Sequence, residues 1–323
     1  MPSVTLSPTS TADDVLAVHG AHVKGKVVLV TGSNTGIGFE TARSLAAAGA
    51  VVFAAARSQA SSEATVAKIK DLAQGSDVHP LELELGSFAS VRKAAATFLA
   101  TQRPLHVLVC NAGIMACPLG FTSDGIETQF GVNHLGHFLL TSLLLDKLKA
   151  SAPARVVVLS SFGHYIFTDH RGILFDDLGL AGSVAYYNNW ERYGNSKLAN
   201  ILFVKELQRR LDAEAADVTC VAVHPGTITD SNLYRHEGLF QLSAVQYLPR
   251  MALAAFWNAI YKRRKTVPQG ASTTVLCASA PGIVKGEYYA DNQLEGANRS
   301  EHINNAQMAA KLWQVSEEAV KQH

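Results

Sequence analysis

Short apolar runs rich in β-branched residues alternate with longer segments of helical composition along most of the chain. Such runs are typical of strands buried on both faces of a parallel sheet, and their alternation with helices predicts βαβ units and an α/β fold. We expect strands at 27–30 and 51–56, within 78–85, and at 105–110, 156–159, 218–223 and 286–289. We expect helices at 11–19, 39–48, 61–74, 88–100, 131–149, 193–204, 269–276 and 308–320.

Composition and charge narrow the class of protein. The 323 residues are 48% apolar and 17% charged, which suits a globular protein with a large core. A net charge of +1 gives no reason to expect a nucleic-acid partner. No run reaches the roughly 18–20 apolar residues of a membrane-spanning helix, and residues 1–14 lack the segments of a signal peptide. The four cysteines show no metal-binding spacing, so we expect reduced thiols, no metal and a cytoplasmic location.

Three glycines, Gly32, Gly36 and Gly38, separate the first expected strand from the first long helix. Glycines let the backbone approach a pyrophosphate, and the start of a helix offers unpaired N–H groups and the positive end of its dipole. A tight strand-to-helix turn is the alternative interpretation of the same residues. The second strand at 51–56 completes the βαβ unit of a dinucleotide-binding fold, which favours a cofactor site.

The spacing of these glycines resembles the short-chain dehydrogenase/reductase family. The motifs of that family appear once each and in order: Thr31-Gly32-x-x-x-Gly36-Ile37-Gly38, Asn111-Ala112-Gly113, Asn133, Ser161, Tyr193-x-x-x-Lys197 and His224-Pro225-Gly226. Segments 34–42, 132–138 and 196–203 resemble its retinol-dehydrogenase branch and, especially closely, the oxidoreductase domain of WW-domain-containing oxidoreductases. The resemblance implies a single Rossmann-type domain, a doubly wound parallel sheet with helices on both faces, over 25–323. Residues 1–24 would form an N-terminal arm and a short helix.

The resemblance also assigns four catalytic residues. Tyr193 would exchange a proton with the substrate, and Ser161 would hold the substrate oxygen. Lys197 would bind the nicotinamide ribose, while Asn133 would kink its helix and free a carbonyl that supports a proton relay. A free phenol has a pKa near 10, too high for a base at neutral pH, and a neighbouring Lys197 ammonium would favour the phenolate.

The end of the second strand indicates the choice of cofactor. An acid there binds the ribose 2′-hydroxyl of NAD, whereas a basic residue accommodates the 2′-phosphate of NADP. Arg57 is basic and no acid occupies 53–57, so we expect NADP(H) in preference to NAD(H), with an ordinary surface arginine as the alternative. Thr35 stands where many NADP-preferring relatives have a basic residue, and Glu84 is one methylene longer than the family's aspartate. The resemblance implies these cofactor contacts: Gly32, Asn34, Thr35, Gly36, Ile37, Gly38, Arg57, Glu84, Leu85, Asn111, Ala112, Gly113, Tyr193, Lys197, Pro225, Gly226, Thr227 and Thr229.

Two long segments are expected on the substrate side. Residues 162–192 form an aromatic-rich connection beside the predicted active site, and residues 231–266 follow the last cofactor loop. The part at 239–261 is strongly apolar and is followed by four basic residues at 262–265. It is interpreted as a substrate lid, a packing helix or an interfacial helix, so peripheral membrane contact through 239–265 remains an alternative.

These observations favour an NADP-dependent oxidoreductase that interconverts a small apolar alcohol and its aldehyde or ketone. Two other functions stay open on the same fold: a non-catalytic cofactor-binding scaffold, and an epimerase or dehydratase. The complete set of four catalytic residues argues against the scaffold. The glycine spacing and the length of the domain favour the reductase over the epimerase. An oligomer is compatible with the sequence.

Overall fold

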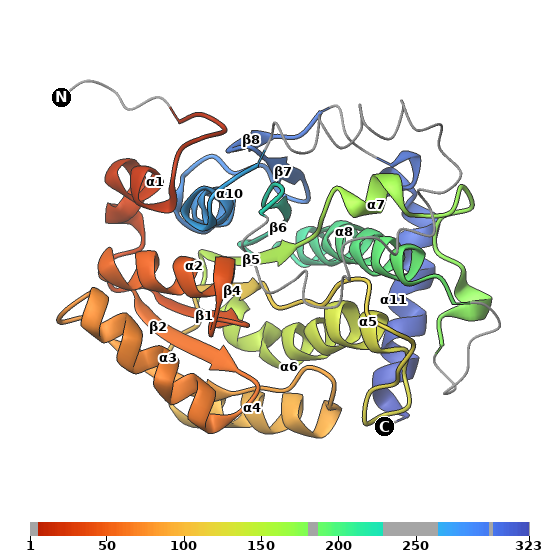
Figure 1. Cartoon of the computed structure of the whole chain (residues 1–323), viewed down its shortest axis with the longest axis horizontal. Coiled ribbons are helices and arrows are strands. Elements are labelled where there is room, and N and C mark those ends of the chain that lie inside the picture. The colour runs from red at the N-terminus through yellow and green to blue at the C-terminus, as the bar shows by residue number, and fades with distance from the viewer. Residues whose placement is uncertain (1–5, 180–186, 229–263, 297–299, 323) are drawn as a thin grey trace.

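The computed structural model describes residues 6–179, 187–228, 264–296 and 300–322. Within these ranges one sheet has the strand order β3-β2-β1-β4-β5-β6-β7-β8 (Figure 1). Strands β1 to β7 are paired in parallel, and β8 pairs antiparallel with β7. The strands are β1 (Val27–Thr31), β2 (Val51–Ala56), β3 (Val78–Glu82), β4 (Val107–Cys110), β5 (Ala154–Leu159), β6 (Val218–His224), β7 (Tyr288–Ala290) and β8 (Gln293–Leu294).

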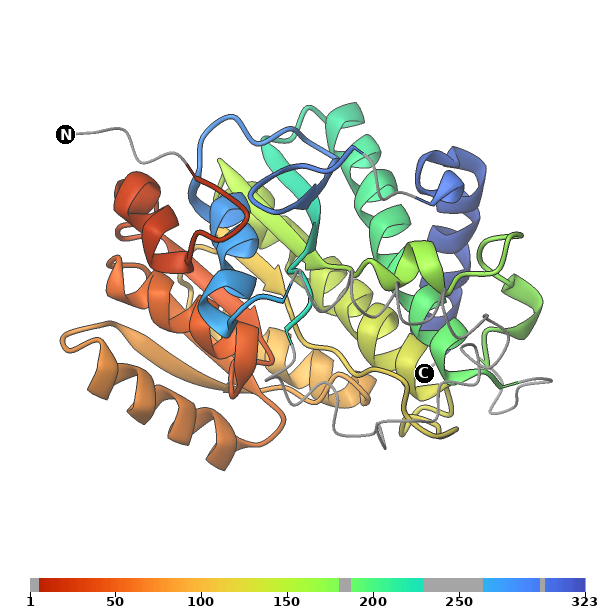
Figure 2. The same cartoon turned by 45° about the horizontal axis from the view of Figure 1, so that its top comes forward.

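Helices cover both faces of the sheet, which confirms the predicted doubly wound α/β fold. One face carries α1 (Ala12–His19), α2 (Gly36–Ala47), α3 (Gln59–Leu72) and α10 (Val267–Ser279). The other carries α4 (Phe88–Ala100), α6 (Gly136–Ala150) and α8 (Asn189–Ala213), with α11 (Ala306–Lys321) packed against α8. Figure 2 shows α10 beside α1 and α2 at one end of the molecule, and α11 beside α8 at the opposite end. The short elements are η1 (Gly20–His22), α5 (Thr128–Phe130), η2 (Gly131–Leu135), α7 (Gly163–Ile166), η3 (Phe175–Asp177) and η6 (Glu301–Asn304).

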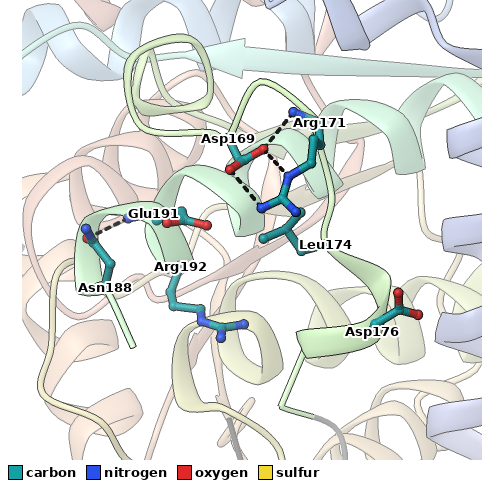
Figure 3. Close-up of a pocket in the computed structure, with 7 residues that line it drawn as sticks. All are labelled: Asp169, Arg171, Leu174, Asp176, Asn188, Glu191 and Arg192. Carbon is teal, nitrogen blue, oxygen red and sulfur yellow. Dashed lines mark hydrogen bonds and ion pairs between the residues drawn. The ribbon is translucent and has the colours of Figure 1, made fainter. Parts of the chain in front are cut away.

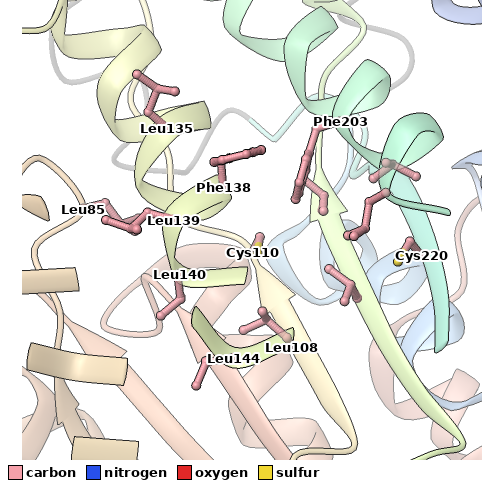
Figure 4. Close-up of a cluster of buried hydrophobic side chains, with 14 of the residues drawn as sticks. Leu85, Leu108, Cys110, Leu135, Phe138, Leu139, Leu140, Leu144, Phe203 and Cys220 are labelled. Carbon is pink, nitrogen blue, oxygen red and sulfur yellow. The ribbon is translucent and has the colours of Figure 1, made fainter. Parts of the chain in front are cut away.

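The core lies in two layers because alternate residues of each strand face opposite sides of the sheet. In β1, Val27 and Leu29 join the layer under α4, α6 and α8, while Val28 and Val30 join the layer under α2 and α10. Figure 4 shows the first layer, in which Phe138 of α6 and Phe203 of α8 meet edge to face with ring centroids 5.5 Å apart. Both layers exclude water from the strands, as the apolar runs of the sequence predicted.

The helix expected over 131–149 is interrupted. The chain forms α5, then one turn of π-helix in η2, and only then α6. A π turn inserts one extra residue into a helix and is frequent at functional sites. Asn133 lies within this turn, where the resemblance placed a kink.

The hairpin of β7 and β8 was not predicted. Asp291 and Asn292 join the two strands and have φ angles of 51° and 61°. Positive φ at both central residues is typical of a two-residue hairpin turn, and Asp and Asn tolerate it better than most residues. A strand of two residues is too short to give an alternating pattern in the sequence.

The topological switch point of the sheet lies between β1 and β4. Strands β2 and β3 extend the sheet on one side of β1, and β5 to β8 extend it on the other side of β4. In open α/β sheets, ligands bind outside the carboxyl ends of the strands at such a point. The glycine loop follows β1 and the loop at 111–113 follows β4, so both predicted cofactor segments meet there.

Candidate active site

Thr31 joins the two loops at the switch point. Its hydroxyl accepts hydrogen bonds from the backbone N–H groups of Asn111 (2.9 Å) and Ala112 (3.0 Å). The side-chain amide of Asn111 donates in return to the backbone carbonyl of Thr31 at 2.8 Å. These hydrogen bonds hold the loop after β4 directly beside the loop after β1. The small residues Ala112 and Gly113 leave room there for a cofactor that crosses the ends of the strands.

Two glycines make this close approach possible. Gly32 has a φ of 65°, and a Cβ built on it would lie 2.8 Å from the Cβ of Ala112. A Cβ on Gly38 would overlap both the side-chain amide of Asn111 and the carbonyl oxygen of Gly32. Neither position accepts a side chain without moving the loop at 111–113, so the glycines have a packing role as well as the predicted cofactor role.

The first turn of α2 faces the same loop. Thr35 is its extended N-cap residue and the helix begins at Gly36, so the backbone N–H groups of Gly36, Ile37 and Gly38 belong to the unpaired end of a helix. Asn34 and Thr35 are exposed. These groups fit a dinucleotide pyrophosphate, which needs donors and a positive dipole end.

The predicted adenine side of the site lies after β2 and β3. Arg57 is exposed and makes no hydrogen bond or ion pair with the described part of the chain, so its charge is available to a ligand. Glu84 is half-buried, and its Oε1 accepts a hydrogen bond from the N–H of Gly86 at 3.0 Å. The side chain of Leu85 is buried in the core, so only the backbone of this residue could contact a cofactor.

Tyr193 and Lys197 lie one turn apart on α8 and share a face of that helix. The Nζ of Lys197 is 5.8 Å from the centroid of the Tyr193 ring and donates to the carbonyl of Leu159, at the end of β5, at 3.1 Å. Tyr193 is 3% exposed and Lys197 is 4% exposed. Burial lowers the pKa of Lys197 to about 8, because the low-polarity interior disfavours its ammonium.

Asn133 reaches α8 through a hydroxyl that the sequence analysis did not single out. Its Nδ2 donates to the Oγ of Ser196 at 2.9 Å, and that Oγ donates to the carbonyl of Tyr193 at 2.8 Å. Asn133 also exchanges two hydrogen bonds with the backbone of Ile114, next to Gly113. A Cβ on Gly113 would lie 3.2 Å from the Oδ1 of Asn133 and 3.4 Å from the Nζ of Lys197.

Ser161 is brought to Tyr193 by the short helix α7. The Oγ of Ser161 accepts the N–H of Gly163 at 3.1 Å. A Cβ on Gly163 would lie 2.8 Å from the Cε1 of Tyr193, so the phenol ring packs directly over this glycine. His164 is buried, and its Nδ1 hydrogen-bonds the carbonyl of Ser161. The structure thus gathers all four predicted catalytic residues around the carboxyl ends of β4 and β5.

Several supporting residues were missed: His137, His164, Ser196 and Asn200. His137 and His164 hydrogen-bond the backbone carbonyls of Asn133 and Ser161. Ser196 hydrogen-bonds the side chain of Asn133, and Asn200 donates to the carbonyl of Leu159, to which Lys197 also donates. Ser196 and Asn200 lie within one turn of Lys197, which is the one sequence signal that could have found them. The two histidines bond backbone carbonyls, and every residue has a backbone carbonyl, so the sequence does not indicate these partners.

The loop after β6 contains three more predicted cofactor residues. Thr227 forms a parallel bridge with Arg264, and its carbonyl accepts the N–H of Lys265 at 2.9 Å. Pro225 and Gly226 precede it at the carboxyl end of the strand. Thr229 lies outside the described residues, as does the range 229–263, which includes most of the expected excursion at 231–266 and of the segment at 239–265.

A cavity of about 430 Å³ lies in the other excursion, at 162–192. Five of its seven lining residues are charged, among them the Asp169–Arg171 ion pair (Figure 3). None of the four predicted catalytic residues lines it, so we do not identify it with the substrate site. The lining residues are Asp169, Arg171, Leu174, Asp176, Asn188, Glu191 and Arg192.

The surroundings of Tyr193 are apolar instead. Its ring forms a small buried cluster with Met115, Ala116 and Trp190, separate from the two core layers. The ring of Phe167 packs on Trp190 with centroids 4.7 Å apart. Among the described helices, none is long and apolar enough to cross a membrane.

Comparison with known proteins agrees with this geometry. The family model described as short chain dehydrogenase matches residues 26–166. Retinol dehydrogenase 12 of Homo sapiens is 43% identical over 294 residues, covering 90% of this chain and 85% of that protein. The WW domain-containing oxidoreductase of Pongo abelii is 40% identical over 97% of this chain and 72% of its own length. A solved structure of an uncharacterized protein from Mycobacterium Paratuberculosis is 34% identical, with a TM-score of 0.70 over 94% of this chain and 97% of that one. The chain therefore belongs to the short-chain dehydrogenase/reductase family, among relatives that include retinol dehydrogenases and WW domain-containing oxidoreductase, as its motifs predicted.

Proposed function

We propose that this protein is an NADP-dependent oxidoreductase that interconverts an apolar alcohol and its aldehyde or ketone. Membership of the family makes it an oxidoreductase that uses a nicotinamide cofactor. The proposed reaction rests on the cluster of Tyr193, Lys197, Asn133 and Ser161 at the carboxyl ends of β4 and β5, beside the glycine loop that follows β1.

The cofactor would lie across the switch point. The first turn of α2 would offer N–H groups to the pyrophosphate, and Asn111, Ala112 and Gly113, which lie between this turn and Lys197, would also contact the cofactor. Arg57, exposed and without an ion pair in the described part of the chain, supports the preference for NADP, because the extra 2′-phosphate is a dianion that a guanidinium binds well. The bound nicotinamide would supply or accept the hydride.

The chain's own residues would handle the proton. Tyr193 would donate its phenolic proton to a carbonyl oxygen during reduction, and take it back from the alcohol during oxidation. Ser161 would hydrogen-bond the same oxygen as its charge develops. Lys197, held near the phenol by Leu159, would stabilise the phenolate as long as its amine is protonated. Asn133 would support this arrangement through Ser196.

Two observations support an apolar substrate. Tyr193 lies in a buried apolar cluster with Met115, Ala116 and Trp190, which fits an apolar substrate. The relative named retinol dehydrogenase 12 acts, by its name, on an apolar alcohol.

The test is a fluorescence titration with NADPH and separately with NADH, followed by a turnover screen with retinal, aliphatic aldehydes and apolar ketones. We expect tighter binding of NADPH and NADPH-dependent reduction of at least one apolar carbonyl. Equal binding of the two cofactors would remove the role of Arg57. Binding without any turnover would favour the scaffold function, and binding of neither would contradict the enzyme altogether.

A further inference from the structure

His137 connects the cofactor side of the site to the catalytic side. It lies in the first turn of α6 and is fully buried, with 1% of its surface exposed. Its Nδ1 is 3.0 Å from the carbonyl oxygen of Asn133, and its Nε2 is 2.9 Å from the hydroxyl oxygen of Thr31. One imidazole therefore touches both the threonine that organises the loop after β4 and the backbone of a predicted catalytic residue.

The hydrogen bonds of Thr31 determine where the imidazole proton lies. A threonine hydroxyl has two acceptor positions and one donor proton. The N–H groups of Asn111 and Ala112 occupy both acceptor positions, so the hydroxyl must donate. The Nε2 of His137 at 2.9 Å is a better acceptor than the carbonyl of Val109 at 3.4 Å. Nε2 therefore carries no proton, and the proton of the neutral ring is on Nδ1.

The neutral ring is consistent with its surroundings. The pKa of His137 is lowered to about 4, mainly because burial disfavours the charged ring; the hydrogen bond to the carbonyl of Asn133 raises it, and the nearby Lys197 ammonium lowers it. With one proton, on Nδ1, the ring donates to the carbonyl of Asn133 and accepts from Thr31. A doubly protonated ring would direct an N–H at the hydroxyl of Thr31, which has no acceptor position left.

The carbonyl of Asn133 is the group that this bond orients. It belongs to the π turn η2, where the regular α-helical hydrogen-bond pattern is broken. The side chain of Asn133 is already committed to Ile114 and Ser196. Without the imidazole, the direction of this carbonyl would depend on the π turn alone.

We propose that His137 is a positioning residue, whose Nδ1–H fixes the carbonyl of Asn133 relative to Lys197 while its Nε2 anchors that carbonyl to the Thr31 junction of the cofactor loops. This inference rests on the proposed oxidoreductase function. His137 touches neither substrate nor cofactor and acts through Asn133. The arrangement makes catalytic alignment depend on the same hydroxyl that holds the loop at 111–113 in place.

Two conservative variants separate the two nitrogens. In His137→Asn, an amide nitrogen can take the place of Nδ1 and donate to Asn133, while the contact with Thr31 is lost. In His137→Gln, the amide lies further out, near the place of Nε2, and the bond to the carbonyl of Asn133 is lost. His106→Gln is the matched control, since the Nδ1 of His106 also bonds backbone, accepting the N–H of Val27 at 2.9 Å, but at the amino end of β1.

We expect His137→Gln to lower kcat by about tenfold or more, with the KM and Kd for the cofactor unchanged, because only proton transfer loses its support. His137→Asn should lose less of kcat than His137→Gln, because it keeps the bond to the carbonyl of Asn133 and loses only the anchor to Thr31, and His106→Gln should equal the wild type in kcat. Wild-type kcat in His137→Gln, or equal losses in the Asn and Gln variants, would overturn the positioning role. Absence of turnover in the wild type would instead overturn the proposed function and this inference with it.

An NMR measurement on protein with nitrogen-labelled histidine tests the geometry independently of turnover. The nitrogen shifts distinguish a protonated from an unprotonated imidazole nitrogen. We expect His137 to be the neutral Nδ1–H form throughout the neutral pH range. A ring protonated at Nε2 would contradict the proposal even in an active enzyme.

Discussion

The Nζ of Lys197 donates to the carbonyl of Leu159 at 3.1 Å, inside a site where the lysine is 4% exposed. The same carbonyl also accepts from the amide of Asn200 at 3.0 Å, so it keeps a partner when the lysine is replaced. Burying an ammonium costs free energy, and its folded pKa of about 8 lies below the 10.5 of an unperturbed lysine. The site therefore holds a charge that disfavours folding.

This leads to a prediction for stability. At pH 7 the amine is protonated in both the folded and the unfolded chain, so the full cost is present. Between pH 8 and 10.5 the unfolded chain binds more protons than the folded one, and the free energy of unfolding rises with pH. Lys197→Met should therefore be more stable than the wild type at pH 7, by at most about 3 kcal/mol. Activity should be lost.

Chemical denaturation at pH 7 and pH 10 measures the free energy of unfolding of the wild type and of Lys197→Met at each pH. The advantage of the methionine variant should shrink towards pH 10, because the wild type then releases its proton and the variant has none to release. A stability difference that is the same at both pH values would contradict a buried, protonated Lys197.

A second prediction concerns the cofactor preference. Arg57→Ala removes the exposed guanidinium at the end of β2 and should weaken NADPH binding by about tenfold or more, while NADH binding changes little. Arg103→Ala is the control, because Arg103 lies at the amino ends of the strands, before β4, where it pairs with Asp77 at 3.3 Å, whereas Arg57 follows the carboxyl end of β2. Fluorescence titrations with both cofactors measure the effect. Unchanged NADPH binding in the Arg57 variant would show that Arg57 is an ordinary surface arginine with no role in cofactor binding.

A third prediction tests the close approach of the two loops. Gly38→Ala places a methyl group onto the side-chain amide of Asn111 and the carbonyl of Gly32, so the loops must separate. We expect loss of cofactor binding together with a lower melting temperature. Gly20→Ala serves as the comparison, since its Cβ would meet neighbours at 3.5 and 3.7 Å, which is ordinary contact. If both alanine variants bind cofactor like the wild type, the glycine loop is not the pyrophosphate site.

The order of strands and helices could be predicted because buried strands of a parallel sheet are continuous apolar runs. The run at 27–30 became β1 and the run at 51–56 became β2, paired in register from Val27 with Val51 onwards. The interruption at η2 could not be predicted this way. Its sequence is compatible with a regular helix, and the π turn coincides with the contacts between Asn133 and Ile114, which are distant in sequence.

The candidate site could likewise be predicted only in part. Tyr193 and Lys197 were predicted from their helical spacing and from the order of motifs, and α8 indeed places them on one face. The aromatic residues at 162–192 predicted an apolar wall of the substrate site. Phe167 and Trp190 of this segment pack beside Tyr193, whereas the cavity in the same segment is lined mainly by charged residues such as Asp169 and Arg171. Composition counts residue types, and it does not tell which of them face a cavity after the chain has folded.

The most direct test of the account compares the wild type with Tyr193→Phe, which removes one hydroxyl and leaves the ring over Gly163 in place. Turnover of an apolar carbonyl with NADPH and the Kd for NADPH are measured on both proteins. We predict that the variant loses turnover by about a hundredfold or more, since the proton donor is gone, while its Kd stays close to the wild-type value. Unaltered turnover in Tyr193→Phe would contradict the assignment of this tyrosine as the acid and base of the reaction.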